Sequence, residues 1–464
     1  MTLLPGLVRT PFYLIRFWAA GIIAAWASAA RGAEAFSPPP LRLAIIGDSL
    51  SAEYDSLTGI AGVDDPTVYA AITVSGWESM SWVEVLGRLR PAQVDLGGYG
   101  TDLLQWGLLR FSGYENNFAV PGFEASHFEQ IVNSTIFSHP QYLAYKQQIA
   151  DGLRNRTDGL VVWLGANEFR ANYRSLCEGN DPVPLIDALR HDLEQVLDFV
   201  REQEPGLRVV VVNLPDLGAA PDKQADIPDP LKRARATAAT LLANQAIAAL
   251  AADRGIPVAD AFSETHQLAA GETAWIGPVD LFPGSHPDNH PRFQFTRDGL
   301  HPNTCLQAII ARKILDAFRL DYAFEAAPIT DGEILGLIGI DPMQPYRDWA
   351  SANALAAGDP GDDPDADRIP NLAEFVFGLD PRSPSPPPLA IDSSTTPVSA
   401  RYRPDPDRLR LVEVQPEWSA NLQSWAPVPE QYLAADAAGQ AVVSFPVDTP
   451  QHFLRLRILH RAVP

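Results

Sequence analysis

The stretch Leu41-Arg-Leu-Ala-Ile-Ile-Gly-Asp-Ser-Leu50 begins with a mostly apolar run and ends in a turn. Its first six residues are typical of a buried strand. Three similar runs follow, at Gly159–Leu164, Leu207–Val212 and Ile256–Ala259, and amphipathic helices are predicted at 184–203 and 230–254. Apolar strands that alternate with helices indicate a parallel sheet covered on both faces. We therefore predict a three-layer α/β/α domain over residues 36–325.

The composition and charge of the chain indicate a globular protein and argue against two kinds of binding partner. The chain has 464 residues, of which 35 are Lys or Arg and 57 are Asp or Glu, so its net charge is −22. Hydrophobic residues make up 46% and charged residues 20%, which is an ordinary globular balance. The negative charge argues against a nucleic-acid partner and against binding to an anionic membrane surface.

Residues 1–35 are predicted to be a signal peptide. Arg9 and Arg16 precede the apolar run 17–27, and small residues follow at Ala27-Ser28-Ala29 and Ala33-Glu34-Ala35. The alternative is an uncleaved membrane anchor, but the run is shorter than the ~20 residues that a span needs. We expect a secreted, periplasmic or cell-surface protein with no stable membrane span in its mature chain.

The composition changes after Phe324. Residues 326–389 are predicted to be a helical, acidic linker with helices at 346–357 and 372–377 and a proline-rich end at 381–388. Apolar residues alternate from 390 to 464, with the clearest strands at 409–414 and 453–458. This alternation predicts a small all-β module, whose ligand stays open.

A nucleophile candidate follows the first strand. Ser49 comes directly after Gly47-Asp48, where a tight turn can expose a hydroxyl above the carboxyl end of the sheet. A serine nucleophile needs a base and a group that orients the base. His301 has Asp298 three residues earlier across a turn that contains Gly299. The alternatives are a helix N-cap for Ser49 and a capping loop for Asp298 and His301.

Two loops after predicted strands offer donors for an oxyanion. One is Asn117-Phe-Ala-Val-Pro-Gly122, with the Gly122 amide, and the other is Gly165-Ala-Asn167-Glu168, with the Asn167 side chain. Both are also ordinary turn residues.

These four segments together resemble the blocks of the SGNH (GDSL) hydrolases, in the family's order, over about residues 40–320. The resemblance implies a flavodoxin-like fold with Ser49 as nucleophile, His301 as base and Asp298 as its partner. It also implies an oxyanion hole formed by the Ser49 and Gly122 amides and the Asn167 side chain. Glu168 departs from the Asp that is frequent in the family. The long insertion 52–116 holds Trp77, Trp82, Trp106 and Tyr99, which either line a cleft or belong to the core.

Cys177 and Cys305 are the two cysteines of the chain. Cys177 lies ten residues after Asn167, and Cys305 lies four residues after His301. Export permits disulfides, so we predict a Cys177–Cys305 bridge between the two loops. The alternative is two free buried thiols.

An acidic loop has the spacing of a calcium site. Six residues offer oxygen ligands at positions 1, 3, 5, 7, 9 and 12: Asp363, Asp365, Asp367, the carbonyl of Ile369, Asn371 and Glu374. This is EF-hand spacing, although Arg368 stands where glycine is usual. We predict a structural calcium ion here, against the alternative of a solvated acidic linker.

The sequence thus predicts a secreted serine esterase that acts on carboxylic esters, with acetylated polysaccharide as the first candidate substrate. No cofactor is expected for catalysis. Within enzymes, the alternatives are a lipase or lysophospholipase and a thioesterase. The alternative class is a non-catalytic carbohydrate- or cell-surface-binding protein on a degenerate hydrolase fold.

Overall fold

A parallel sheet organises the amino-terminal part of the chain. In the computed structural model, five strands are hydrogen-bonded in the order β2-β1-β5-β6-β7. They are β1 (Leu41–Gly47), β2 (Val94–Asp95), β5 (Gly159–Trp163), β6 (Arg208–Val212) and β7 (Val258–Ala259). The structure describes residues 39–54, 77–101, 109–110, 112–355, 358–394, 397–446 and 453–460. The predicted signal peptide lies outside these residues.

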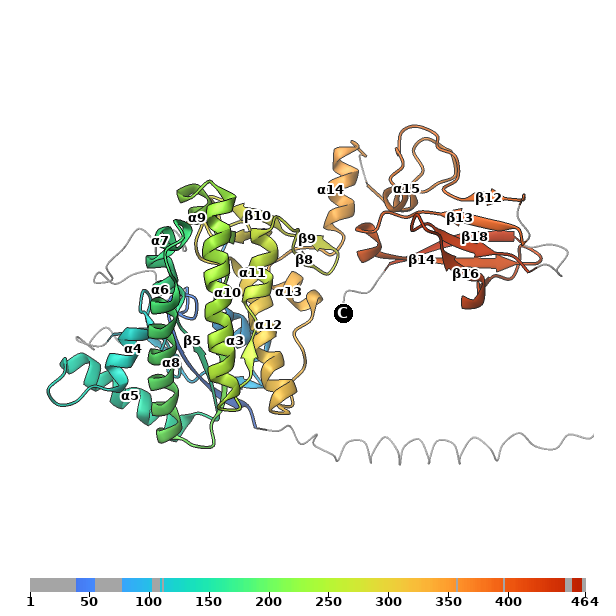
Figure 1. Ribbon diagram of the computed structural model, residues 1–464. Coiled ribbons are helices and arrows are strands. Elements are labelled where there is room, and N and C mark those ends of the chain that lie inside the picture. Colours follow the sequence, from blue (N-terminus) through green and yellow to red (C-terminus); the bar gives the residue numbers. More distant parts are fainter. Residues whose placement is uncertain are drawn as a thin grey trace, which may run out of the picture. The chain divides into compact units, whose positions relative to one another are not determined.

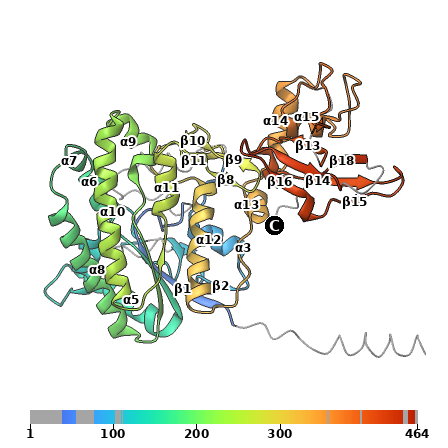
Figure 2. The same ribbon diagram turned by 45° about the vertical axis from the view of Figure 1, so that its right-hand side comes forward.

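Side chains alternate between the two faces of the sheet, and each face is covered. Leu43 and Ile45 pack in a core with α3 (Trp82–Leu89) and α12 (Thr304–Asp321). Ala44 and Ile46 lie in the opposite core. Four helices contribute to this second core together with two shorter ones: α4 (Ala125–Val132), α5 (Pro140–Arg156), α8 (Val183–Gln203) and α10 (Pro230–Ala252). Figures 1 and 2 both show α8 and α10 side by side on this face. The three-layer α/β/α prediction is confirmed.

The helices begin where their sequences provide caps. The Asp229 carboxylate accepts a hydrogen bond from the Leu231 amide, and Pro230 opens α10, where its missing N–H costs nothing. Ser81 and Glu84 form a capping box at the start of α3. Asn303 caps α12, which therefore starts three residues after His301.

Short elements connect the main ones. The helices are α6 (Ala166–Ala171), α7 (Tyr173–Cys177), α9 (Pro221–Asp226), α11 (Phe262–Ala269) and α13 (Asp331–Leu337). The paired strands are β3 (Tyr99–Thr101) with β4 (Ser112–Tyr114), β8 (Trp275–Ile276) with β9 (Val279–Asp280), and β10 (Phe282–Ser285) with β11 (Phe293–Phe295).

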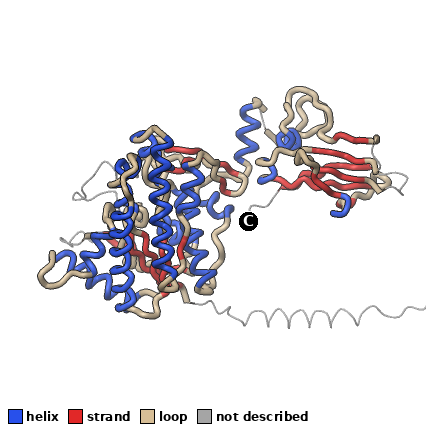
Figure 3. Tube along the Cα trace, viewed as in Figure 1, coloured by secondary structure: helices blue, strands red, loops and turns tan. Residues whose placement is uncertain are grey.

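Two helices and two antiparallel sheets form the carboxyl-terminal part. The helices are α14 (Gln344–Ala352) and α15 (Asn371–Phe377). One sheet has the order β12 (Ala390–Asp392), β13 (Ser399–Tyr402), β17 (Ala441–Ser444), β16 (Leu433–Ala435). The other has the order β15 (Ala426–Pro427), β14 (Val412–Ser419), β18 (Phe453–His460). The strands, red in Figure 3, agree with the predicted all-β tail.

One predicted strand differs in detail. Residues Arg408–Arg410 form a short 3-10 turn, and β14 starts only at Val412. Leu411 and Val412 pack with Tyr346 and Phe375, so the helices and β14 share a core. No helix among the described residues has both the length and the apolarity that a membrane span requires.

Candidate active site

Ser49 lies on a tight turn at the carboxyl end of β1. The Asp48 carboxylate accepts a hydrogen bond from the Leu50 amide at 2.9 Å, and the Asp48 carbonyl accepts from the Ser51 amide at 3.0 Å. The turn depends on Gly47. A Cβ on Gly47 would lie 2.8 Å from the Ser51 side chain and 3.2 Å from the Trp163 carbonyl, too close for any other residue.

His301 connects Ser49 to Asp298. Its Nε2 lies 2.9 Å from Ser49 Oγ, and its Nδ1 lies 2.5 Å from Asp298 Oδ2. When Nδ1 carries the proton, it donates to Asp298, and Nε2 accepts from the Ser49 hydroxyl. The structure therefore brings the three residues of the predicted triad into one hydrogen-bonded series.

Asp298 is held as a carboxylate. Its Oδ1 accepts from Thr296 Oγ1 at 2.8 Å, from the Leu300 amide at 2.8 Å and from the His301 amide at 3.0 Å. Burial acts to raise the pKa of Asp298, but the charge of His301 and the hydrogen bonds from His301 and Leu300 outweigh it and lower this pKa to about 2. An ionised partner fixes the imidazole tautomer that can accept a proton from serine.

A buried tyrosine supports the histidine loop. The Tyr54 hydroxyl donates to the Pro302 carbonyl at 2.9 Å, and Gln307 Nε2 donates to that hydroxyl at 2.7 Å. The Tyr54 ring meets the His301 ring edge-on, with 6.3 Å between centroids. Tyr54 thus joins the nucleophile turn to the start of α12, a role that the sequence did not reveal.

The predicted oxyanion loops lie at the same edge of the sheet. The Val120 amide donates to the Gly47 carbonyl at 2.9 Å, and Asn117 Nδ2 donates to the Ser51 carbonyl at 2.8 Å, which ties the 117–122 loop to the nucleophile turn. Within the described residues, the amides of Ser49 and Gly122 donate to no protein group. Both amides are therefore available to a ligand.

Asn167 lies in α6, just beyond β5. Its Nδ2 donates to the Phe123 carbonyl at 2.9 Å and, over a longer 3.3 Å, to Asp48 Oδ2. The turn before it needs Gly165, which has a φ of 111° and whose Cβ would lie 2.8 Å from Leu214. Asn167 is thus oriented by one acceptor in the nucleophile turn and by another directly after Gly122.

Two buried carboxylates stand beside Asn167. Asp48 is 1% exposed, and burial raises its pKa to about 6. Glu168 is 7% exposed, and burial raises its pKa to about 7, although hydrogen bonds from backbone amides favour its charged form. One oxygen of Glu168 accepts from the Ala125 amide, so Glu168 links α6 to the start of α4. No sequence motif indicates a role for Glu168, because the burial of a side chain is not visible in a motif.

A small pocket of about 40 Å³ opens beside Ser49 and His301. Its wall is mainly apolar, with one basic side chain. Besides those two residues and Asn167, it is lined by Asp48, Leu50, Ala166, Arg170, Pro215, Asp216, Leu217, Ala220, Thr265, Phe295, Leu300 and Pro302.

The predicted disulfide is wrong. Cys177 and Cys305 are both free and buried. Cys177, at the end of α7, packs in the core that contains Ile46, whereas Cys305, in α12, packs in the core that contains Ile45. The two thiols thus lie on opposite sides of the sheet, and Cys305 Sγ instead contacts the Phe293 carbonyl at 3.2 Å.

Of the aromatic residues of the insertion, one is confirmed as core, and neither Trp77 nor Tyr99 lines the pocket beside Ser49. Trp82 is fully buried, and its Nε1 donates to Ser51 Oγ at 3.1 Å, so it belongs to the core. Trp77 and Tyr99 are 43% and 49% exposed. Trp106 lies outside the described residues.

No curated protein matches the chain. Solved structures that match include an extracellular lipase from Streptomyces rimosus, 17% identical, covering 60% of this chain and 97% of that one, with a TM-score of 0.33. A carbohydrate esterase of family 3 from Talaromyces cellulolyticus is 16% identical, with 61% and 99% covered and a TM-score of 0.32. Phospholipase A1 from Streptomyces albidoflavus is 15% identical, with 59% and 98% covered and a TM-score of 0.31.

The family model described as GDSL-like lipase/acylhydrolase matches residues 43–314, which is more than half of the chain. That range contains the nucleophile turn, both donor loops and the Asp298–His301 pair. The protein is an ester hydrolase, and its chain belongs to the GDSL-like lipase/acylhydrolase family.

Proposed function

We propose that this protein is a secreted serine esterase that hydrolyses carboxylic esters with short acyl groups, above all acetyl, through an acyl-enzyme on Ser49. One observation carries the proposal. Ser49, His301 and Asp298 form a hydrogen-bonded series beside a small pocket.

In the proposed reaction, Ser49 Oγ attacks the ester carbonyl carbon while His301 Nε2 takes the hydroxyl proton. The ester C–O bond then breaks, and His301 returns the proton to the leaving alcohol. Water attacks the acyl-enzyme with His301 again as base, which releases the carboxylic acid and free Ser49. Asp298 stays ionised throughout and stabilises the imidazolium.

The carbonyl oxygen becomes negative in each tetrahedral intermediate, and we assign its donors to the amides of Ser49 and Gly122 and the side chain of Asn167. One N–H of the Asn167 side-chain amide donates to the Phe123 carbonyl. The other points at Asp48 Oδ2, which lies 3.3 Å from Nδ2. That second contact is long for a charge-assisted hydrogen bond. An oxyanion can therefore compete for this N–H at small cost.

Pocket size favours a short acyl group. A volume of about 40 Å³ holds about three water-sized groups, since each needs some 10–15 Å³. An acetyl group has three non-hydrogen atoms. A long acyl chain would have to extend beyond this pocket.

Acetylated polysaccharide is the proposed natural substrate class. The Arg-flanked apolar run of residues 1–35 supports export, and a polymer outside the cell is accessible to an exported enzyme. We further propose that the antiparallel sheets of residues 390–460 hold the polymer during repeated cleavage.

Steady-state hydrolysis of aryl acetate, butyrate and octanoate tests the reaction. We expect the highest kcat/KM with acetate and a loss of activity in Ser49→Ala and His301→Ala. Ser175→Ala in α7 and His191→Ala on the exposed face of α8 are matched controls and should keep wild-type rates. Wild-type hydrolysis by folded Ser49→Ala would reject the proposal, and a preference for octanoate would reject its short-acyl part. Release of acetate from acetylated xylan then tests the polymer.

A further inference from the structure

Three carboxylates converge in the loop before α15. One oxygen from each of Asp363, Asp365 and Asp367 lies within 4.8 Å of the other two, and all three residues are half-buried. Like charges at this separation repel one another. Among the described residues, no ion pair involves any residue from 363 to 374. The cluster thus holds negative charge that no basic side chain of this part of the chain neutralises.

A buried carboxylate beside the cluster supplies an independent observation. Glu374, in α15, is 0% exposed, and neither of its oxygens has a hydrogen-bond partner among the described residues. Glu374 lies in the first turn of α15, which begins directly after the loop. In the same turn, the Asn371 amide donates to the Asp362 carbonyl at 2.8 Å, which holds the start of α15 against the start of the loop. Leaving a buried carboxylate without a partner is costly, so its side chain is suited to a cation.

A second buried side chain of α15 also has an oxygen without a hydrogen-bond partner among the described residues. Asn371, the first residue of α15, is 1% exposed, and its Oδ1 has no partner in the described structure. Its Nδ2 donates to the Asp359 carbonyl at 3.0 Å, which fixes the orientation of the amide. Asp365 Oδ2 is likewise buried without a partner. Unpartnered oxygens thus come from both the loop and the helix.

The loop backbone is folded tightly around the aspartates. Asp363 Oδ1 accepts from the Asp367 amide at 3.2 Å, and Asp363 Oδ2 accepts from the Arg368 amide at 2.8 Å. Asp367 Oδ1 accepts from the Ile369 amide at 2.7 Å. Arg368 has a φ of 75°, the left-handed conformation that glycine adopts most easily. Arginine at this position therefore makes the sharp turn for which glycine is usual.

From these contacts we propose that residues 363–374 bind one Ca²⁺ ion. The ligands are the side chains of Asp363, Asp365 and Asp367, the Ile369 carbonyl, Asn371 directly or through water, and both oxygens of Glu374. Such a set supplies more than six oxygens, all hard donors, which suits Ca²⁺ better than the smaller, octahedral Mg²⁺. The proposal is independent of the esterase reaction, because none of these residues lines the Ser49 pocket.

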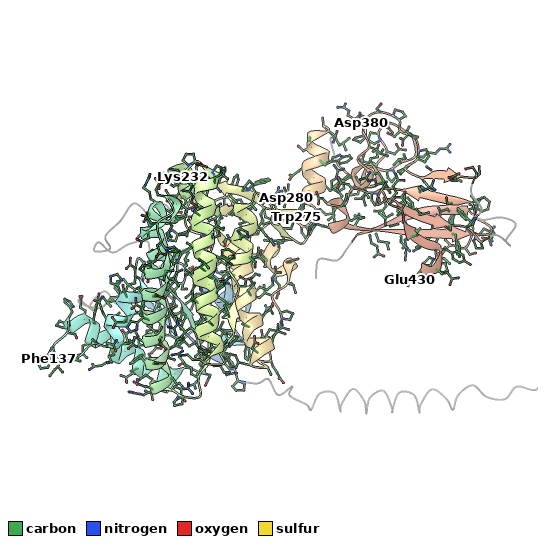
Figure 4. All side chains as sticks on the ribbon, viewed as in Figure 1. Phe137, Lys232, Trp275, Asp280, Asp380 and Glu430 are labelled. Carbon is green, nitrogen blue, oxygen red and sulfur yellow. The ribbon has the colours of Figure 1, made fainter. Side chains whose placement is uncertain are left out.

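Calorimetric titration of the full mature chain, stripped with a chelator, tests the site with CaCl₂ and MgCl₂. We expect one Ca²⁺ per chain and at least tenfold weaker Mg²⁺ binding, roughly as for flexible oxygen sites. Glu374→Gln should weaken Ca²⁺ binding at least ~10-fold, because a neutral amide gives a single weaker donor. Glu430→Gln is the matched control (Figure 4), since Glu430 is an exposed acidic residue of the β module. No Ca²⁺-dependent heat in the wild type, or equal binding by Glu374→Gln, would overturn the proposal.

Thermal melting separates a ligand role from a packing role. Without calcium, Glu374→Gln should melt at or above the wild-type temperature, because it removes a buried, repelled charge. With saturating calcium, it should melt below the wild type. A residue that only packs would shift the melting temperature equally in both conditions, and that result would overturn the proposal. Arg368→Gly should tighten Ca²⁺ binding by relieving the left-handed turn, and unchanged binding would contradict this assignment of the turn.

Discussion

The carboxylate of Asp48 and the side-chain amide of Asn167 face each other across the carboxyl edge of the sheet, with Oδ2 and Nδ2 3.3 Å apart. Asp48 is the residue before the nucleophile candidate, and Asn167 belongs to α6. The contact therefore links the turn that carries Ser49 to the side chain that we assign to the oxyanion hole.

Replacing Asn167 by alanine tests that assignment. We expect kcat for an aryl acetate to fall by ~10²–10³, the usual loss for one oxyanion donor, with little change in KM. The control is Asn155→Ala, in which an exposed amide on α5 loses only a hydrogen bond to the Asp151 carbonyl. A wild-type kcat in folded Asn167→Ala would remove Asn167 from the oxyanion hole.

Replacing Asp48 by asparagine tests the positioning role. The new amide can still accept from the Leu50 amide through its oxygen, but its NH₂ group then faces the NH₂ group of Asn167. Because Asn167 loses one orienting acceptor, we expect kcat to fall by roughly 10- to 100-fold, less than in Asn167→Ala. Steady-state kinetics of the two single variants and the double variant would check this. Fully additive losses would show that the two residues act separately.

Glu168 makes folding stability depend on pH. The pKa of Glu168 is about 7 in the folded chain and near 4.5 when unfolded, so the folded chain binds this proton more tightly. Protonated Glu168 therefore adds about 3 kcal/mol to the free energy of unfolding below pH 4.5. This stabilisation is lost as the pH rises to about 7. Asp48 acts in the same direction up to about pH 6.

Urea unfolding of wild type and Glu168→Gln at several pH values between 4.5 and 8 measures this effect. We expect the free energy of unfolding to fall less steeply with pH in Glu168→Gln than in the wild type. The exposed Glu202→Gln in α8 should keep the wild-type slope. If Glu168→Gln and wild type had parallel pH profiles, Glu168 would not hold its proton at neutral pH.

The cysteines should both be free thiols in the folded protein. Alkylation after denaturation, followed by intact-mass measurement, should add two alkyl groups per chain with or without reductant. An increase from zero to two groups on reduction would restore the disulfide and contradict the placement of Cys177 and Cys305 on opposite sides of the sheet.

Continuous apolar runs made the sheet predictable. The runs that begin at Leu41 and Gly159 are buried on both faces, and their lack of alternation indicates such strands directly. β2 was missed because Val94–Asp95 is too short to leave a pattern. The 409–411 part of a predicted strand was wrong because alternation of Leu409 and Leu411 fits a short 3-10 turn as well.

The candidate site was predictable where a residue lies in a motif and unpredictable where burial decides its role. Ser49, Asp298 and His301 follow from motifs at strand ends. Nothing local in the sequence distinguishes Glu168 from a solvated glutamate, and nothing marks Tyr54 as the support of His301. The disulfide prediction failed because it used only how close each cysteine lies in sequence to a loop of the site. Closeness in sequence does not show which face of the sheet a side chain occupies.

Covalent labelling of Ser49 tests the central claim most directly. Ser49 Oγ should attack the phosphorus of a fluorophosphonate and displace fluoride into solvent, and peptide mass spectrometry should locate one phosphonyl group per chain on Ser49. Labelling should be absent in Ser49→Ala, slow in His301→Ala and unchanged in Ser175→Ala, with esterase activity lost in proportion to labelling. An adduct on a different residue, or full activity in a chain that carries the adduct on Ser49, would contradict the proposed acyl-enzyme.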